Sequence, residues 1–202
     1  VLFLDELPEF RHDVLEALRQ PLEDGFITVS RAAATATYPA EFVLVAAMNP
    51  CPCGNYGSRI HPCRCSRTQI EKYRGRISGP LLDRIDIQIE MPEVGFGELS
   101  DRSGGEPSTE VRARVERARE RQRERFKDDG ILVNAQMNAR LIKQYCSPDK
   151  ASEQLLQRAY AELKLSARAY QRILKVARTI ADVEGLEQVQ LSHYAEAIQY
   201  RS

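Results

Sequence analysis

Two adjacent carboxylates, Asp5 and Glu6, directly follow an apolar run at residues 1–4. A continuous apolar run of this kind favours a strand that is buried on both faces, as in a parallel sheet. At the carboxyl end of such a strand, Asp5 could hold a hydrated magnesium ion and Glu6 could polarise an attacking water. The alternative is an ordinary strand end, because four hydrophobic residues before Asp-Glu often occur by chance.

Two further residues could act on a phosphate group. Asn49 follows a second apolar segment, residues 42–48, and its amide could reach a γ-phosphate or the lytic water. Asn-Pro is also a common turn initiator, which leaves an ordinary turn as the alternative. Arg84, at the end of a short predicted helix, could stabilise charge on a phosphate held by a neighbouring subunit. Its alternative is a salt bridge to Asp83 or Asp86.

Four of the five cysteines form a C-x-C-x₉-C-x-C pattern, which comprises Cys51, Cys53, Cys63 and Cys65. Two close pairs separated by a loop suit tetrahedral zinc coordination by thiolates, and His61 is a substitute ligand. Such a site would be structural, because four thiolates leave no open position for a substrate. Another metal, an iron–sulfur cluster or free thiols are the alternatives. Disulfides require an oxidising compartment, and nothing in the sequence suggests secretion.

Residues 1–95 alternate β-rich and helical stretches, which indicates an α/β core. The pattern predicts a helix around residues 14–18 bounded by Pro21, and a third strand at residues 85–89 from alternating isoleucines. It also predicts a β-hairpin over residues 27–37, with Arg31 near its small-residue turn. An Arg at that position is an economical contact to a nucleic-acid phosphate, or simply an exposed turn charge.

Glycine and serine enrichment predicts a flexible linker at residues 96–107, followed by an all-helical region at 108–202. Helix starts are predicted at Ser147-Pro148, at Ser166 and at Ser192. The helix that begins after Ser166 is expected to end at Gly185, and it carries Arg168 near its N-terminus. Residues 109–127 hold eight basic and four acidic side chains, which favours a solvated face with ion pairs over a nucleic-acid or partner contact.

The chain has 202 residues, of which 43% are hydrophobic, with 29 basic and 29 acidic side chains. This balance excludes a protein that binds nucleic acid through overall positive charge, so any such contact needs a local patch. No stretch approaches the roughly 18 apolar residues of a membrane span, and no secretory leader is present. We therefore expect a soluble, cytoplasmic chain. Its start at Val1 looks like a cut through a larger protein.

In their order along the chain, these features resemble the AAA+ ATPases, and more narrowly the magnesium-chelatase-like branch with its ComM/YifB group. The resemblance spans nearly the whole chain, and the Cys-Pro-Cys insertion at residues 51–65 is its most specific part. The stretches that carry it are Leu4-Asp5-Glu6-Leu7-Pro8-Glu9-Phe10, Leu18-Arg19-Gln20-Pro21-Leu22-Glu23, Ala47-Met48-Asn49-Pro50-Cys51-Pro52-Cys53-Gly54, Ser78-Gly79-Pro80-Leu81-Leu82-Asp83-Arg84-Ile85-Asp86 and Leu165-Ser166-Ala167-Arg168-Ala169-Tyr170.

The resemblance implies a role for each matching residue. Asp5 and Glu6 look like the Walker B pair, and Asn49 looks like sensor 1. Arg84 looks like the arginine finger that acts in trans, and Arg168 like sensor 2. The hairpin with Arg31 looks like the pre-sensor-1 hairpin, which in related hexameric helicases touches DNA in the central channel. The implied fold is a partial AAA+ parallel-sheet core with a β-hairpin and a zinc-type insertion, followed by a helical lid.

The family also needs a Gly-rich phosphate loop that ends in Gly-Lys, and no glycine here is followed by lysine. The resemblance therefore implies the C-terminal part of an ATP- and Mg²⁺-using, ring-forming homo-oligomer, expected to be hexameric. Its ATP hydrolysis would drive DNA remodelling, such as branch migration in recombination or natural transformation. The isolated chain is expected to be inactive. The alternatives are an ATPase subunit of a magnesium chelatase, or a non-catalytic zinc-stabilised module that binds nucleic acid or a partner.

Overall fold

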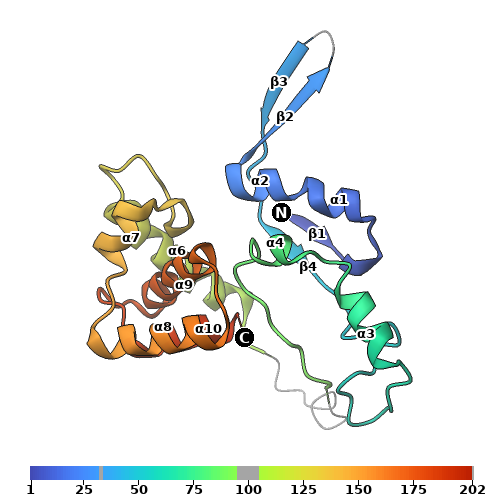
Figure 1. Ribbon diagram of the computed structural model, residues 1–202. Coiled ribbons are helices and arrows are strands. Elements are labelled where there is room, and N and C mark those ends of the chain that lie inside the picture. Colours follow the sequence, from blue (N-terminus) through green and yellow to red (C-terminus); the bar gives the residue numbers. More distant parts are fainter. Residues whose placement is uncertain (32–33, 95–104, 202) are drawn as a thin grey trace. The chain divides into compact units, whose positions relative to one another are not determined.

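The computed structural model describes residues 1–31, 34–94 and 105–201, which form two compact units, Val1–Ile85 and Asp86–Ser202 (Figure 1). Most of the linker predicted at residues 96–107 lies outside the described residues. None of the described helices is both long and apolar enough to cross a lipid bilayer. The first unit mixes strands and helices, and the second is helical in its described part, so the mixed α/β prediction is confirmed.

The first unit contains a short parallel sheet made of β1 (Leu2–Leu4) and β4 (Leu44–Ala46). Phe3 lies opposite Val45 in the register, so the two side chains share one face of the sheet. On the other face, Leu4 packs against a small buried cluster formed by Leu7, Leu15, Ile77 and Leu81. The predicted parallel sheet is thus present, with shorter strands than the apolar runs suggest.

The first unit also contains short helices: η1 (Leu7–Glu9), α1 (His12–Ala17), α2 (Arg19–Asp24), α3 (Arg67–Arg74) and α4 (Gly79–Leu82). Pro21 does not bound a helix as predicted, because it lies in the first turn of α2, where a missing N–H costs little. The α2 helix ends instead at Gly25, whose φ of 73° is left-handed. The α4 helix begins after Ser78, whose side chain accepts a hydrogen bond from the Leu81 N–H.

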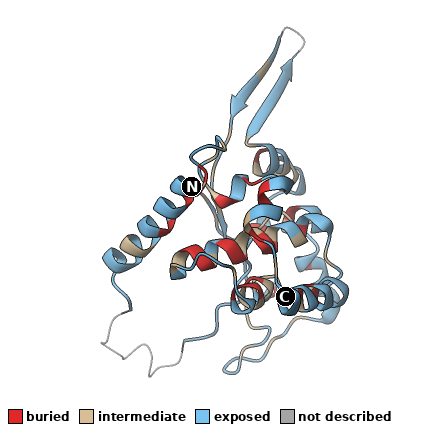
Figure 2. Ribbon diagram, turned by 90° about the vertical axis from the view of Figure 1, so that its left-hand side faces the viewer, coloured by how far each residue is buried: buried red, intermediate tan, exposed pale blue. Residues whose placement is uncertain are grey.

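The predicted hairpin is formed by β2 (Phe26–Arg31) and β3 (Ala34–Pro39), and it projects from the rest of the first unit (Figure 1). One face carries paired hydroxyls: Thr28 and Thr37 lie 3.3 Å apart, and Ser30 and Thr35 2.9 Å apart. The other face carries Ile27, Val29 and Arg31. Nearly every described hairpin residue is exposed (Figure 2).

The strand predicted at residues 85–89 is wrong. This segment has no regular secondary structure, and Ile87 and Ile89 are 48% and 65% exposed. An alternating pattern makes a strand only where a neighbouring strand supplies ladder partners, and none of the described strands pairs with it. Its backbone bond is instead from the Gln88 N–H to the Tyr200 carbonyl, at 2.9 Å.

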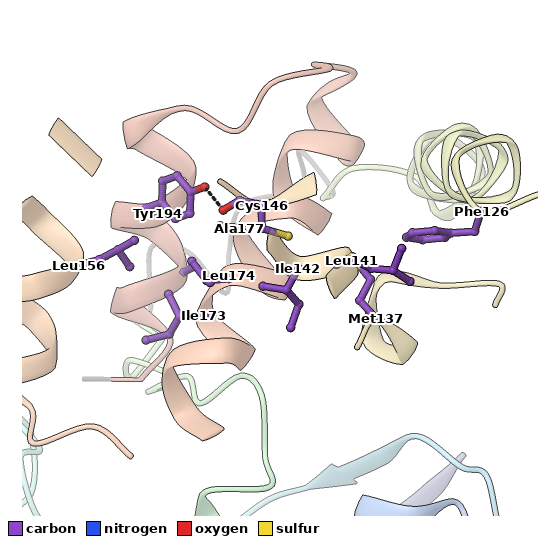
Figure 3. Packing of buried hydrophobic residues seen from close by; sticks show 11 residues of the cluster. Phe126, Met137, Leu141, Ile142, Cys146, Leu156, Ile173, Leu174, Ala177 and Tyr194 are labelled. Atoms are coloured by element: carbon purple, nitrogen blue, oxygen red, sulfur yellow. Dashed lines mark hydrogen bonds between the residues drawn. The ribbon is translucent and has the colours of Figure 1, made fainter. Parts of the chain in front are cut away.

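The second unit packs its helices around one apolar cluster (Figure 3). The Tyr194 hydroxyl, fully buried there, donates to the Cys146 carbonyl at 2.8 Å, so the cluster's tyrosine keeps its hydrogen bond. The predicted helical region is confirmed for the described residues. Its elements are α6 (Ser108–Arg125), η2 (Asn134–Gln136), α7 (Ala139–Tyr145), α8 (Lys150–Glu162), α9 (Ala167–Glu184) and α10 (Leu191–Gln199).

Of the three predicted helix starts, the structure confirms the one at Ser166 and shifts the other two. Ser166 caps α9 through the Ala169 N–H, and the helix ends at Gly185 as expected. The cap of α8 is Asp149 rather than Ser147-Pro148, because its carboxylate accepts from the Ser152 N–H at 2.8 Å. The cap of α10 is Gln190, which forms a capping box with His193, so Ser192 lies inside the first turn.

A buried charge cluster ties α6, η2 and α9 together. Asp182 is fully buried and accepts hydrogen bonds from Arg125 (2.8 Å), Arg178 (2.9 Å) and Asn134 (2.8 Å). Burial alone would raise the pKa of Asp182, but the bonds from Arg125 and Asn134 and the charge of Arg178 hold that pKa below its ordinary value. The carboxylate is therefore the common partner of two arginines.

We predict that Asp182→Asn lowers the free energy of unfolding by about 3–5 kcal/mol at neutral pH, because it leaves two poorly solvated arginines without their counter-charge. Since the folded pKa is depressed, this stabilisation is complete above the unfolded value of about 3.9 and is lost as pH falls through the folded value. Urea unfolding across pH measures both effects. The exposed Glu162→Gln serves as control, and a loss below about 1 kcal/mol for Asp182→Asn would contradict the role.

Candidate catalytic residues and cysteine cluster

The acidic pair lies in a tight turn directly after β1. The Glu6 backbone is left-handed, with φ 51° and ψ 45°, and the Asp5 carboxylate accepts a 2.9 Å hydrogen bond from the Glu6 N–H. A non-glycine residue holds this conformation only when its surroundings impose it. Both flanks are fixed by Ala47: its N–H donates to the Leu4 carbonyl at 2.9 Å, and its carbonyl accepts from the Leu7 N–H at 2.9 Å.

Because β1 and β4 are parallel, the acidic turn and Asn49 leave the same edge of the sheet. Tyr73 of α3 is 6% exposed, and its pKa responds both to the Asn49 backbone and to the charge of Glu6. Burial above all, with the charges of Glu9 and Glu6, raises the pKa of Tyr73. Sequence reasoning missed Tyr73, because its only signal is an aromatic residue on a polar helix.

Arg84 is held by its own unit. Its side chain is only 9% exposed, and it forms an ion pair with Glu23 of α2. Its Nε donates to the Arg19 carbonyl at 3.2 Å, and its Nη1 donates to the Pro80 carbonyl at 2.6 Å. Glu23 lies 61 residues earlier in the chain and was not anticipated from the sequence, which suggested nearby aspartates. In this conformation the guanidinium joins the end of α4 to α2.

The two remaining arginines lie on exposed positions. Arg31 is the last residue of β2 and is paired in register with Ala34. Arg168 is the second residue of α9, just after the Ser166 cap. Arg168 belongs to the second unit, and Asp5, Glu6 and Asn49 belong to the first. Their shared role thus stays a prediction.

The structure brings the four paired cysteines together. Their sulfur atoms all lie within 4.8 Å of one another, with Cys51–Cys53 at 3.4 Å, Cys51–Cys63 at 3.7 Å and Cys53–Cys63 at 3.6 Å. Four thiolates around zinc at about 2.3 Å give sulfur–sulfur edges of about 3.8 Å, so the donor set fits this ion. His61 is outside this group of possible ligands, and the buried Cys146 belongs to the second unit.

Local backbone structure positions these sulfurs. Gly54 adopts a left-handed φ of 81° directly after Cys53, which turns the chain away from the first pair. Cys65 directly precedes the capping box of α3, in which Ser66 and Gln69 bond reciprocally. Backbone bonds from Arg64 and Asn55 lower the pKa of Cys53 to about 6, whereas burial raises the pKa of Cys65 to about 12. Backbone donors aimed at Cys53 stabilise the thiolate form that a metal requires.

Comparisons with known proteins cover both units. The family model described as magnesium chelatase, subunit ChlI, matches residues 1–99, and the model of that subunit's C-terminal part matches residues 105–201. Competence protein ComM of Haemophilus influenzae is 48% identical, and the uncharacterized protein YifB of Escherichia coli is 46% identical. An uncharacterized protein of Mycobacterium bovis is 39% identical.

Each of these alignments covers the whole chain but only 39% of the relative, so the chain spans about two fifths of the length of these proteins. The Asp5-Glu6 turn, Asn49 and the cysteine cluster all lie within the first matched region, and Arg168 lies within the second. Together these matches show that the chain belongs to the magnesium-chelatase-like family of AAA+ proteins, in the group that includes ComM and YifB.

Proposed function

We propose that the protein is an AAA+ ATPase that couples ATP hydrolysis to the remodelling of DNA. One observation carries the proposal: the Asp5-Glu6 turn and Asn49 follow adjacent parallel strands and leave one sheet edge, in a chain of the magnesium-chelatase-like family. Ligands of α/β proteins bind outside the carboxyl ends of parallel strands, which is where a phosphate would meet these groups.

Each polar group has a task in this proposal. One oxygen of Asp5 accepts the Glu6 N–H, and its carboxylate would hold hydrated Mg²⁺, which would neutralise charge on the phosphates. Glu6 would take a proton from the water that attacks the γ-phosphorus, while the bond from that phosphorus to the bridging oxygen breaks and ADP leaves. Asn49 would orient that water or the phosphate. Arg168 would sense the bound phosphate. The cradle for the phosphates would come from outside this chain, since no Gly-Lys pair occurs in it.

Completion of the site requires a second subunit, so we propose a ring of identical subunits, expected to be hexameric. Arg84 would approach the phosphate of the neighbouring subunit and stabilise its developing charge. In the described conformation Arg84 forms an ion pair with Glu23. Its approach to the neighbouring subunit would therefore replace the Glu23 carboxylate with a phosphate as its partner. Such an exchange would link subunit contact to catalysis.

DNA is the proposed partner, and the projecting hairpin is its proposed contact. Arg31 offers a cation at the end of β2, and the Thr28–Thr37 and Ser30–Thr35 pairs present hydroxyl donors on the opposite face. The similarity to a competence protein supports a process that handles DNA, such as branch migration. The family description favours a second candidate, ATP-driven insertion of magnesium into a porphyrin.

We predict that Glu6→Gln in the full-length protein lowers kcat for ATP at least 100-fold, in line with the loss of a general base. Stimulation of wild-type turnover by forked or four-way DNA, and its loss in Arg31→Ala, would support DNA remodelling. Stimulation only by porphyrin-binding partners would favour the chelatase function instead. Glu41→Gln, an exposed change in the same unit, is the control, and a Glu6→Gln rate close to wild type would contradict the assignment.

For the cysteine cluster we propose a structural zinc ion that fixes residues 51–65 next to α3. The fit of the sulfur positions to a tetrahedral thiolate site supports this proposal. All four positions would be filled by protein ligands, which leaves no place for a substrate or a reactive water. The cluster would therefore hold the insertion in shape rather than take part in hydrolysis.

Protein purified without chelator is expected to contain about one zinc per chain. Cys51→Ser and Cys63→Ser should lose this zinc and expose residues 51–65 to proteolysis, whereas the control Cys146→Ala should retain it. Elemental analysis and limited proteolysis provide the two measurements. Four reactive thiols with no bound metal, or iron with visible absorption, would each contradict the zinc assignment.

A further inference from the structure

Charge is strongly segregated within the first unit, although the chain as a whole is neutral. Residues 1–49 hold eight acidic and three basic side chains, whereas residues 50–76 hold one acidic side chain, Glu71. We call residues 50–76 the basic knuckle. Its basic side chains are Arg59, Arg64, Arg67, Lys72, Arg74 and Arg76.

All six of these side chains are exposed. Arg67 pairs with Glu71 at 2.8 Å, and Arg76 pairs with Glu9 at 2.9 Å. Arg64 and Lys72 form no ion pair with any residue in the described parts of the chain. Six cations within 27 consecutive residues repel one another, so an exposed segment of this kind is stabilised by an anionic partner.

Contacts within the basic knuckle fix its loop relative to α3. Arg64 lies between Cys63 and Cys65, and its backbone bonds with Cys53. The Arg74 guanidinium lies over the Tyr56 ring at 5.2 Å from its centroid. This contact joins the loop to α3. In Figure 1, α3 and the loop before it extend from the β1–β4 sheet away from the hairpin.

The positive charge persists when a metal is counted. Zinc with four thiolates carries two negative charges, which reduces the formal net charge of the basic knuckle from +5 to +3. The helix α6 differs, although it is rich in arginine. Its 18 residues hold seven arginines interspersed with four glutamates, and Arg114, Arg123 and Arg125 pair with carboxylates. The basic knuckle holds six basic side chains and a single carboxylate, which makes it the stronger candidate for an anion.

We propose that the basic knuckle binds the phosphate backbone of single-stranded nucleic acid. This rests on nucleic acid being the partner in the proposed function, and it adds a contact separate from the hairpin. Arginines present planar forks of donors that match phosphate oxygens. Tyr56, 49% exposed beside Arg74, provides a ring on which a base can stack. Exposed aromatic and basic side chains in alternation are typical of single-strand surfaces.

An acidic protein would be the other possible occupant. The centres of protein interfaces are depleted in charged residues and enriched in apolar ones. On the basic knuckle the large exposed apolar side chains are Tyr56 and Ile60, set among six cations. This composition favours a polyphosphate chain over a protein surface.

The test uses the full-length protein without nucleotide, and fluorescence anisotropy with a labelled oligothymidine. The double change Arg64→Glu/Lys72→Glu should raise Kd at least about 10-fold and reduce the slope of log K against log salt by about 1.4, which corresponds to two lost phosphate contacts. The control Lys150→Glu/Arg158→Glu on α8 makes the same change in charge at exposed positions and should stay within about twofold of wild type. Circular dichroism and metal content verify that each variant is folded.

Tyr56→Ala tests whether a base stacks on the Tyr56 ring. This change should weaken binding of the single strand more than binding of a duplex of the same length. One outcome would overturn the proposal that the basic knuckle binds nucleic acid and leave the proposed function intact. In that outcome Arg64→Glu/Lys72→Glu keeps the wild-type Kd and salt slope, whereas Arg31→Ala weakens binding. If the wild-type protein shows no salt-dependent binding of nucleic acid, the proposal is overturned, and a protein partner for the basic knuckle is favoured instead. ATP turnover in the same preparation reports separately on catalysis.

Discussion

The catalytic proposal depends on two backbone hydrogen bonds made by Ala47. They fix Leu4 and Leu7 on either side of Asp5 and Glu6, and so force the acidic pair into a tight turn with a left-handed Glu6. The same residue lies two positions before Asn49, so the acid and amide groups are positioned by one structural element. Strain in the backbone at Glu6 is offset by this attachment, as is typical of functional sites.

Different forces hold the other parts of the chain. The second unit combines an apolar cluster with one buried carboxylate shared by two arginines, which specifies how α6 and α9 pack. The cysteine insertion has little apolar core around it and relies on four converging sulfurs and the capped α3 helix. A small insertion of this kind commonly needs a metal for stability, because it buries too little apolar surface.

Sequence reasoning succeeded where one local signal determines structure. Ser166 and Gly185 mark the two ends of α9, because caps act within a few residues. The spacing of the cysteines alone predicts the convergence of four sulfur atoms that the structure shows. It failed where the outcome depends on distant partners. The alternation at residues 85–89 gave no strand because a ladder neighbour is absent among the described strands, and the Glu23 partner of Arg84 lies far along the chain. Tyr73 carries no local signal beyond an aromatic side chain on a polar helix, so its place near Asn49 could not be predicted.

The central claim is that the Asp5-Glu6 turn and Asn49 form the hydrolytic side of an ATP site. A structure of the full-length protein with Mg²⁺, ADP and a planar γ-phosphate mimic tests it most directly. The account predicts Glu6 within hydrogen-bond distance of the water in line with the mimic, Asn49 beside that water and Arg84 of an adjacent subunit on the mimic. A mimic bound away from the carboxyl ends of β1 and β4, with Glu6 facing bulk solvent, would contradict it.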